Sequence, residues 1–167
     1  MITTDGRLAA ESIMPDIMPE KKTIESARKD KREGKAPSTQ AGEFVREEME
    51  HIREGKHGAR SAKQAIAIGL SKARRAGVKL PSPENSAAPE TTRRKAKRDL
   101  QKGRAHGGKA TSRKRSRATM KALQREGRSA ASKTALSKQA RSAARKRTRA
   151  ERSAAAKKAG RTRARNG

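Results

Sequence analysis

The sequence predicts a mainly α-helical protein with extensive disorder, made of a small αα-hairpin followed by a basic, partly helical C-terminal tail. Leu, Ile, Val and Phe together make up about a tenth of the 167 residues, and the formal net charge is +28. This composition is typical of chains that bury too little apolar surface to offset the entropy cost of ordering. Apolar residues recur at helical spacing between residues 40 and 80, so the one folded unit is expected there.

Residues 1–39 precede the periodic pattern and are expected to form a flexible N-terminal segment. The first part of this segment has no uninterrupted apolar run and carries Asp5, Glu11 and Asp16, which argues against a secretory or organellar targeting sequence. No stretch of about 18 apolar residues occurs in the sequence. A membrane is therefore not expected among the partners.

The first helix of the hairpin is expected between residues 40 and 54. Val45, Met49 and Ile52 follow one another at i, i+4 and i+7, which places them on one face. Thr39 is the expected N-cap, and Gly55 is the expected stop. The opposite face carries four acidic residues, Glu43, Glu47, Glu50 and Glu54.

The second helix is expected to begin at Ser61 and to end at Gly77. Ser61 and Gln64 form the Ser-x-x-Gln pattern of a capping box. Ile66 and Leu70 lie on the apolar stripe of this helix. The face opposite that stripe carries Gln64, Ser71, Lys72 and Arg75.

Packing the two apolar stripes together predicts an αα-hairpin over residues 40–80. Ile68 lies on the polar face of the second helix, so self-association through the hairpin is one option for that face. The expected core of the hairpin is Val45, Met49, Ile52, Ile66 and Leu70.

The run from Ser61 to Gly77, with Gly55, Lys56 and His57 just before it, resembles a bacterial family of small basic proteins classed as a domain of unknown function. Members of that family are often labelled only as DNA-binding proteins. The resemblance implies DNA binding and a bacterial, cytoplasmic, nucleoid-associated location. It assigns no catalytic residue, because the family has no agreed ones.

A linker and a basic tail are expected after the hairpin. Residues 81–90 contain three prolines and small polar residues, which is the composition of a linker. Residues 91–167, here called the basic tail, hold 28 basic and 3 acidic residues. Like-charge repulsion is expected to keep this tail partly unfolded until phosphates neutralise it. The tail resembles the Lys/Arg/Ala-rich tails of linker histones and of similar bacterial proteins.

The charge of the basic tail predicts a polyanionic partner, and duplex DNA bound without sequence preference is the expected one. The chain has no Cys for a zinc finger and one aromatic residue, which leaves no stacking platform for single-strand readers. Two alternatives stay open: an RNA-binding or ribosome-associated protein, and a protein-interaction module with an ancillary tail. The residues expected to contact phosphates are Arg93, Arg94, Lys95, Lys97, Arg98, Arg113, Lys114, Arg115, Arg117, Arg141, Arg145, Lys146, Arg147 and Arg149.

Neither an enzymatic activity nor a metal site or other cofactor is expected. A Ser-His-Asp arrangement needs a rigid scaffold, and the composition predicts little of one. The histidines are His51, His57 and His106, and apart from neighbouring glutamates nothing in the sequence completes a coordination set around them. Surface positions are therefore expected for the histidines.

Overall fold

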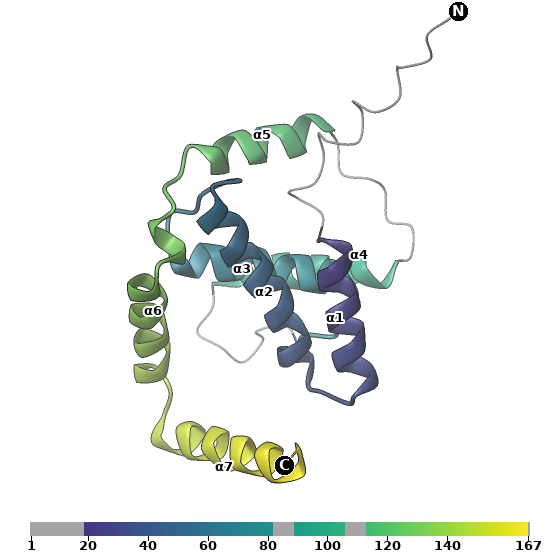
Figure 1. Cartoon of the computed structure of the whole chain (residues 1–167), viewed down its shortest axis with the longest axis vertical. Helices are drawn as coiled ribbons and strands as arrows, with labels where there is room; N and C mark the ends of the chain where they lie inside the picture. Colours follow the sequence, from purple (N-terminus) through teal and green to yellow (C-terminus); the bar gives the residue numbers. More distant parts are fainter. Residues whose placement is uncertain (1–18, 82–88, 106–112, 167) are drawn as a thin grey trace, which may run out of the picture.

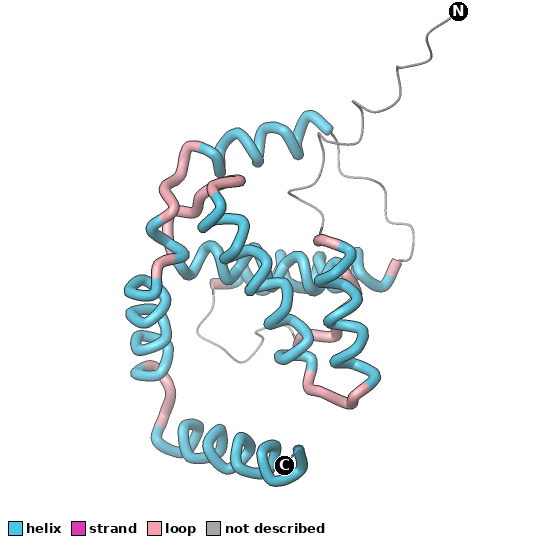
Figure 2. The backbone as a smooth tube through the Cα atoms, viewed as in Figure 1, coloured by secondary structure: helices cyan, strands magenta, loops and turns pink. Residues whose placement is uncertain are grey.

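The structure is a computed structural model that describes residues 19–81, 89–105 and 113–166, and all regular structure in these ranges is helical (Figure 2). The predicted mainly α-helical class is confirmed. The expected disorder of the basic tail is wrong for its described part, which is largely helical. The helices are α1 (Lys21–Arg32), α2 (Pro37–Glu54), α3 (Ala62–Arg75), α4 (Glu90–Arg104), α5 (Arg113–Gln124), η1 (Ser129–Ala131, a 3-10 helix), α6 (Lys133–Arg145) and α7 (Arg149–Asn166).

Helix α1 packs against α2 through a face of mainly small and polar residues, to which the partly buried Ile24 adds one larger apolar side chain. Thr23, Ala27 and Asp30 recur at i, i+4 and i+7 and are buried. Lys35 Nζ lies 2.8 Å from Asp30 Oδ1, so the buried carboxylate has a partner. Residues 21–32 are thus helical rather than part of a flexible segment 1–39, whereas residues 1–18 lie outside the described part of the chain. A face of Thr, Ala and Asp gives no apolar periodicity, which is why the sequence did not predict this helix.

Helix α2 begins earlier than its sequence pattern predicted. The N-cap is Ala36 and Pro37 occupies the first turn, so Thr39 is not the cap. Proline suits this place because its missing N–H would have no intrahelical partner there. The predicted end of α2 is confirmed, since Gly55 follows it with a left-handed φ of 82°.

Helices α2 and α3 pack against each other at a glycine. A Cβ added to Gly69 would lie 2.7 Å from Val45 Cα, so no larger residue fits at this contact. Ser61 Oγ accepts a hydrogen bond from the Gln64 N–H at 3.2 Å, which confirms the predicted start of α3. Gly77, with a φ of 90°, follows the C-terminus of α3.

The pair of α2 and α3 is not an isolated hairpin, because α1 packs on α2 and α4 packs on α3. On α4, Ala96 is buried, and Asp99 Oδ2 accepts a hydrogen bond from Ser71 Oγ at 2.6 Å. A Cβ added to Gly103 would lie 2.1 Å from the Arg74 carbonyl oxygen. Burial lowers the pKa of Arg74, and the charge of Asp99 opposes that effect. The first helix of the basic tail is thus part of the folded unit.

The core consists of two neighbouring clusters. Of the predicted core residues, Met49 and Ile52 are buried, while Val45, Ile66 and Leu70 are partly buried and pack against the clusters. The first cluster contains Ala27, Ala41, Phe44, Ala73, Val78 and Leu80. The second contains Met49, Ile52, Ala59, Ala65, Ala130 and Ala131.

Helices α5, α6 and α7 lie along the outside of the cluster formed by α1 to α4 (Figure 1). The C-terminal end of α5 is attached by two backbone hydrogen bonds, from Gly58 N–H to the Leu123 carbonyl at 3.0 Å and from Ala59 N–H to the Gly127 carbonyl at 3.1 Å. Every described side chain of α7 is exposed. No helix within the described residues is long and apolar enough to cross a membrane.

Candidate nucleic-acid interface and buried charge cluster

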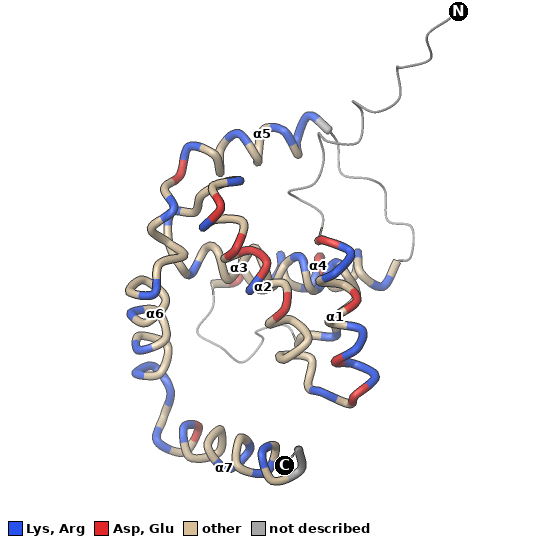
Figure 3. The backbone as a smooth tube through the Cα atoms, viewed as in Figure 1, with Lys and Arg blue, Asp and Glu red and all other residues tan. Residues whose placement is uncertain are grey.

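The residues predicted to contact phosphates lie on four helices and the short connection between α6 and α7. Figure 3 shows basic residues along α4, α5, α6 and α7, whereas acidic residues gather mainly on α1 and α2. The arrangement can therefore offer an extended cationic surface. The predicted residues with described, exposed side chains are Arg94, Lys95, Lys97 and Arg98 on α4, Lys114, Arg115 and Arg117 on α5, Arg141 and Arg145 on α6, Lys146 and Arg147 in the connection, and Arg149 on α7.

Three of the predicted residues are less favourable for phosphate contacts or are not fully described. Arg93 is partly buried. Arg94 is exposed but forms an ion pair with Glu90, one turn earlier on α4, at 2.6 Å. The side chain of Arg113 lies outside the described part of the chain. The surface on α5, α6 and α7 is therefore better suited to phosphate contacts than the start of α4.

A shallow cavity of about 520 Å³ lies where α3 and α6 begin. Arg60, Lys63 and Lys138 are among the residues that line it. Ser61 and Ser132, which cap α3 and α6, are also in its lining. Two helix N-termini carry partial positive charge, which adds to that of the three cations and makes the cavity favourable for an anion.

A second feature is a buried charge cluster formed by Glu47, Glu48, His51, His57 and Lys72. Lys72, expected on a polar outer face, is only 2% exposed as a residue. Its Nζ lies 2.8 Å from Glu48 Oε2 and 3.4 Å from Glu47 Oε1. Glu47 was expected on an exposed acidic face and is also buried, so that face is reduced to Glu43, Glu50 and Glu54. Helices α2 and α3 bring these charges together because they pack side by side.

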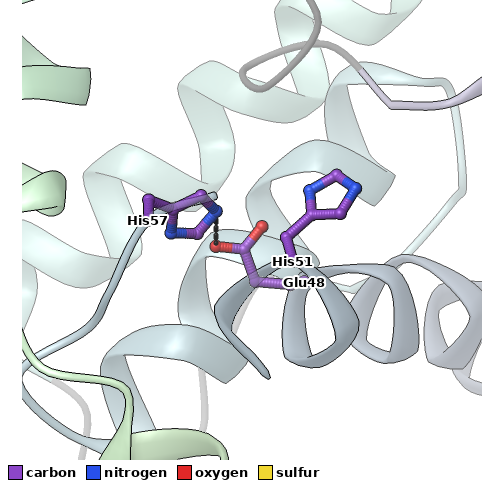
Figure 4. Close-up of side chains that lie close together, drawn as sticks. All are labelled: Glu48, His51 and His57. Atoms are coloured by element: carbon purple, nitrogen blue, oxygen red, sulfur yellow. Dashed lines mark ion pairs between the residues drawn. The ribbon is translucent and has the colours of Figure 1, made fainter. Parts of the chain in front are cut away.

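Two histidines complete the buried charge cluster, one on α2 and one in the loop that follows it (Figure 4). His57 Nε2 lies 3.5 Å from Glu48 Oε1, and the ring centroids of His51 and His57 are 6.2 Å apart. His51 and His57 are both buried. The expectation of surface positions for these two histidines is therefore wrong, while His106 lies outside the described residues.

Each of the two rings has a hydrogen-bond partner on its outer side. His51 Nε2 donates to Glu20 Oε1 at 2.9 Å, and His57 Nδ1 donates to the Gly58 carbonyl at 3.2 Å. The hydrogen bond from His51 is the main reason why the pKa of Glu20 is held below its usual value, and Lys56 acts in the same direction. The hydrogen bond from His51 thus favours the ionised form of the Glu20 carboxyl, which accepts it.

The sequence offered little signal for the buried charge cluster. Glu48 and Lys72 are far apart in the chain. Glu48 stands three residues after Val45 and four before Ile52, so it borders the apolar stripe of α2, and a charged residue at that place is the one signal that the sequence offered. The His57 side chain is buried by the fold of a loop rather than by a helix face. A pairing between buried charges of two helices becomes visible only once their packing is known.

Comparison with models of known protein families matches the first part of the folded unit. Residues 19–84 match the model of a family described as "Family of unknown function (DUF6496)". The matched segment includes α1, α2, α3 and every residue of the buried charge cluster, but less than half of the chain. Searches of curated proteins and of solved structures gave no match.

Proposed function

We propose that this protein binds duplex DNA without sequence preference, through phosphate contacts from the lysines and arginines of α4 to α7. The observation that carries the proposal is the charge of the basic tail, which holds 28 basic and 3 acidic residues. Of the predicted contact residues whose side chains are described, all but Arg93 are exposed. When these lysines and arginines neutralise phosphates, the counterions condensed on the duplex are released, and this release gives the binding its driving force.

The position of the one aromatic residue supports contacts to the backbone rather than to bases. Phe44 is the single Phe in a chain without Trp or Tyr, and it is 1% exposed. Its ring is in the core and cannot stack on a base. Proteins that read single strands depend on such stacking, so a duplex is the better fit to this surface.

The anion-favouring cavity between α3 and α6 supports the same partner. Arg60 and Lys63 at its edge belong to the folded unit, whereas Lys138 belongs to the basic tail. A backbone phosphate at this place would be attracted by both parts of the molecule. We further propose that the protein coats or compacts the nucleoid of a bacterial cytoplasm, since an extended cationic surface can contact several phosphates along one duplex.

A pair of charge-matched variants tests where the DNA is bound. The interface variant replaces six exposed cations by Gln, which keeps helix propensity. The control variant makes six Lys/Arg→Gln changes on α1, where acidic residues lie nearby. Because each variant removes six positive charges, both lower the net charge of +28 equally. The interface positions are Lys114, Arg115, Arg117, Arg145, Arg147 and Arg149. The control positions are Lys21, Lys22, Arg28, Lys29, Lys31 and Arg32.

The readout is the slope of log affinity against log salt concentration for a duplex. If six phosphate contacts are lost, the slope of the interface variant becomes shallower by up to about 5. The control variant should keep a slope close to that of the unchanged protein. Equal slopes in the two variants would mean that net charge alone matters and that α5 to α7 form no interface. Preference for a structured RNA over the duplex in competition would instead support the RNA-binding alternative.

A further inference from the structure

We infer that Glu48, His51 and His57 form a binding site for one divalent transition-metal ion of the zinc type. All three residues are buried, and their nearest potential ligand atoms lie within 4.8 Å of one another. Two imidazoles and one carboxylate are a ligand set that binds zinc in proteins, with a fourth position left for water. This inference does not depend on the proposed DNA binding.

The hydrogen bonds of the two rings place a free lone pair on the inner nitrogen of each histidine. A carboxylate and a backbone carbonyl can only accept, so Glu20 fixes the proton of His51 on Nε2 and the Gly58 carbonyl fixes that of His57 on Nδ1. In the neutral rings, His51 Nδ1 and His57 Nε2 are then the unprotonated nitrogens. Metal-binding histidines in proteins have this arrangement, with the second ring nitrogen donating to a carboxylate or a backbone carbonyl.

The atoms that would face the ion lack hydrogen-bond partners. His51 Nδ1 and Glu48 Oε1 are buried and form no hydrogen bond, whereas Glu48 Oε2 is paired with Lys72 Nζ at 2.8 Å. The burial of such polar atoms is costly unless something pairs with them. A bound cation would satisfy the lone pair of His51 and one oxygen of Glu48 together.

One pair of ligand atoms already has the spacing of a coordination shell, and all three ligand atoms lie within 4.8 Å of one another. With metal–ligand distances near 2.1 Å, two ligands of a tetrahedral ion lie about 3.4 Å apart. The distance of 3.5 Å between His57 Nε2 and Glu48 Oε1 fits this value. Figure 4 shows the carboxylate of Glu48 with the ring of His57 on one side and the ring of His51 on the other.

Lys72 lies next to the site but leaves one ligand atom open. Its Nζ pairs with Glu48 Oε2, so the oxygen nearer to His57 remains available. The second buried carboxylate, Glu47, also faces Lys72 and offsets its charge. The Lys72 ammonium group therefore orients the Glu48 carboxylate and leaves Oε1 free to bind the metal ion.

An ion at this site would hold the loop after α2 in place, because His57 belongs to that loop. The same loop binds the C-terminal end of α5. His57 is adjacent to Gly58, whose N–H donates to the Leu123 carbonyl. A Cβ added to Gly58 would lie 1.9 Å from the Glu126 carbonyl oxygen, which shows how closely the two segments approach. Metal binding would thus stabilise the attachment of α5 to the folded unit.

The test uses the full chain after treatment with a chelator, with Zn²⁺ as the titrant and Co²⁺ as its spectroscopic substitute. We expect uptake of one equivalent of metal and a Co²⁺ absorption typical of tetrahedral coordination. At a free Zn²⁺ concentration of about 100 times the Kd, the Tm should rise by about 10 °C. His51→Gln and His57→Gln should each weaken Zn²⁺ binding by about 100-fold or more. Glu50→Gln is the matched control for Glu48→Gln, because Glu50 is exposed on the same helix and should bind no ion.

Histidine NMR signals give a second readout that needs no variant. The chain has three histidines, so Zn²⁺ should shift the imidazole signals of His51 and His57 and leave that of His106 unchanged. The inference is overturned if the folded chain takes up no Zn²⁺, or if uptake leaves all three imidazole signals unchanged. Binding that is equally strong in His51→Gln and His57→Gln would also overturn it.

Discussion

Lys72→Ala should lower the free energy of unfolding by about 3–5 kcal/mol, because it leaves two buried carboxylates without their cation. Glu47 and Glu48 are 4% and 0% exposed, and Lys72 Nζ is within 3.4 Å of both. The total free energy of unfolding of a folded domain is about 5–15 kcal/mol, so this loss is a large share of the stability. Chemical denaturation of the full chain, followed by circular dichroism, measures it.

Lys63→Ala is the matched control, because Lys63 is an exposed lysine on the same helix. Its replacement should change the free energy of unfolding by no more than about 0.5 kcal/mol. In Lys72→Met, the added change Glu48→Gln should restore part of the lost stability, since it removes a buried charge that has lost its partner. Equal effects of Lys72→Ala and Lys63→Ala would contradict the buried ion pairs.

Phe44→Ala should also cost about 3–5 kcal/mol of unfolding free energy. Phe44 is among the largest fully buried side chains, and it joins α2 to α1 and α3 through the first core cluster. Its removal leaves a cavity that small neighbours such as Ala41 and Ala73 cannot fill. The loss is measured by the same denaturation experiment.

Leu70→Ala provides the comparison for Phe44→Ala. Leu70 belongs to the core that the sequence predicted, but in the structure it is partly exposed. Its replacement should therefore cost less than that of Phe44, because part of its surface already contacts water. A loss for Phe44→Ala no greater than that for Leu70→Ala would contradict the central place of Phe44 in the first core cluster.

Local signals in the sequence predicted the ends of α2 and α3 well. Gly55 and Gly77 take the left-handed conformation that favours glycine after a helix, and Ser61 caps α3. These features depend on neighbouring residues only, so they can be read without knowledge of the packing. Thr39 failed as a cap because Pro37, two positions earlier, is a stronger start for a helix.

Features that depend on distant partners were not predictable in the same way. Helix α2 contacts α1, α3 and η1, so its buried face is much wider than the stripe of Val45, Met49 and Ile52. Glu48 and His51 lie in that wider face and are buried with residues from other parts of the chain. Helix α1 was missed for a related reason, since its buried face depends on Ala27 and on Asp30, which is paired with Lys35.

Most of the predicted contact residues are exposed, because few apolar neighbours exist to cover them. What the sequence could not predict is the docking of α4 and η1 on the folded unit. Both are attached through alanines, Ala96 on α4 and Ala130 and Ala131 in η1. In the sequence, an alanine within a basic helix indicates only high helix propensity. Whether that alanine is buried depends on how the helices pack.

The most direct test of the proposed function is a salt titration of the full chain on two unrelated duplexes of equal length, from about 50 to 200 mM salt. We expect equal affinity for both duplexes and a loss of roughly 10³- to 10⁵-fold over this range, as for about 6–10 neutralised phosphates. Affinity that scarcely changes with salt, or a strong preference for one duplex, would contradict binding through the charge of α4 to α7.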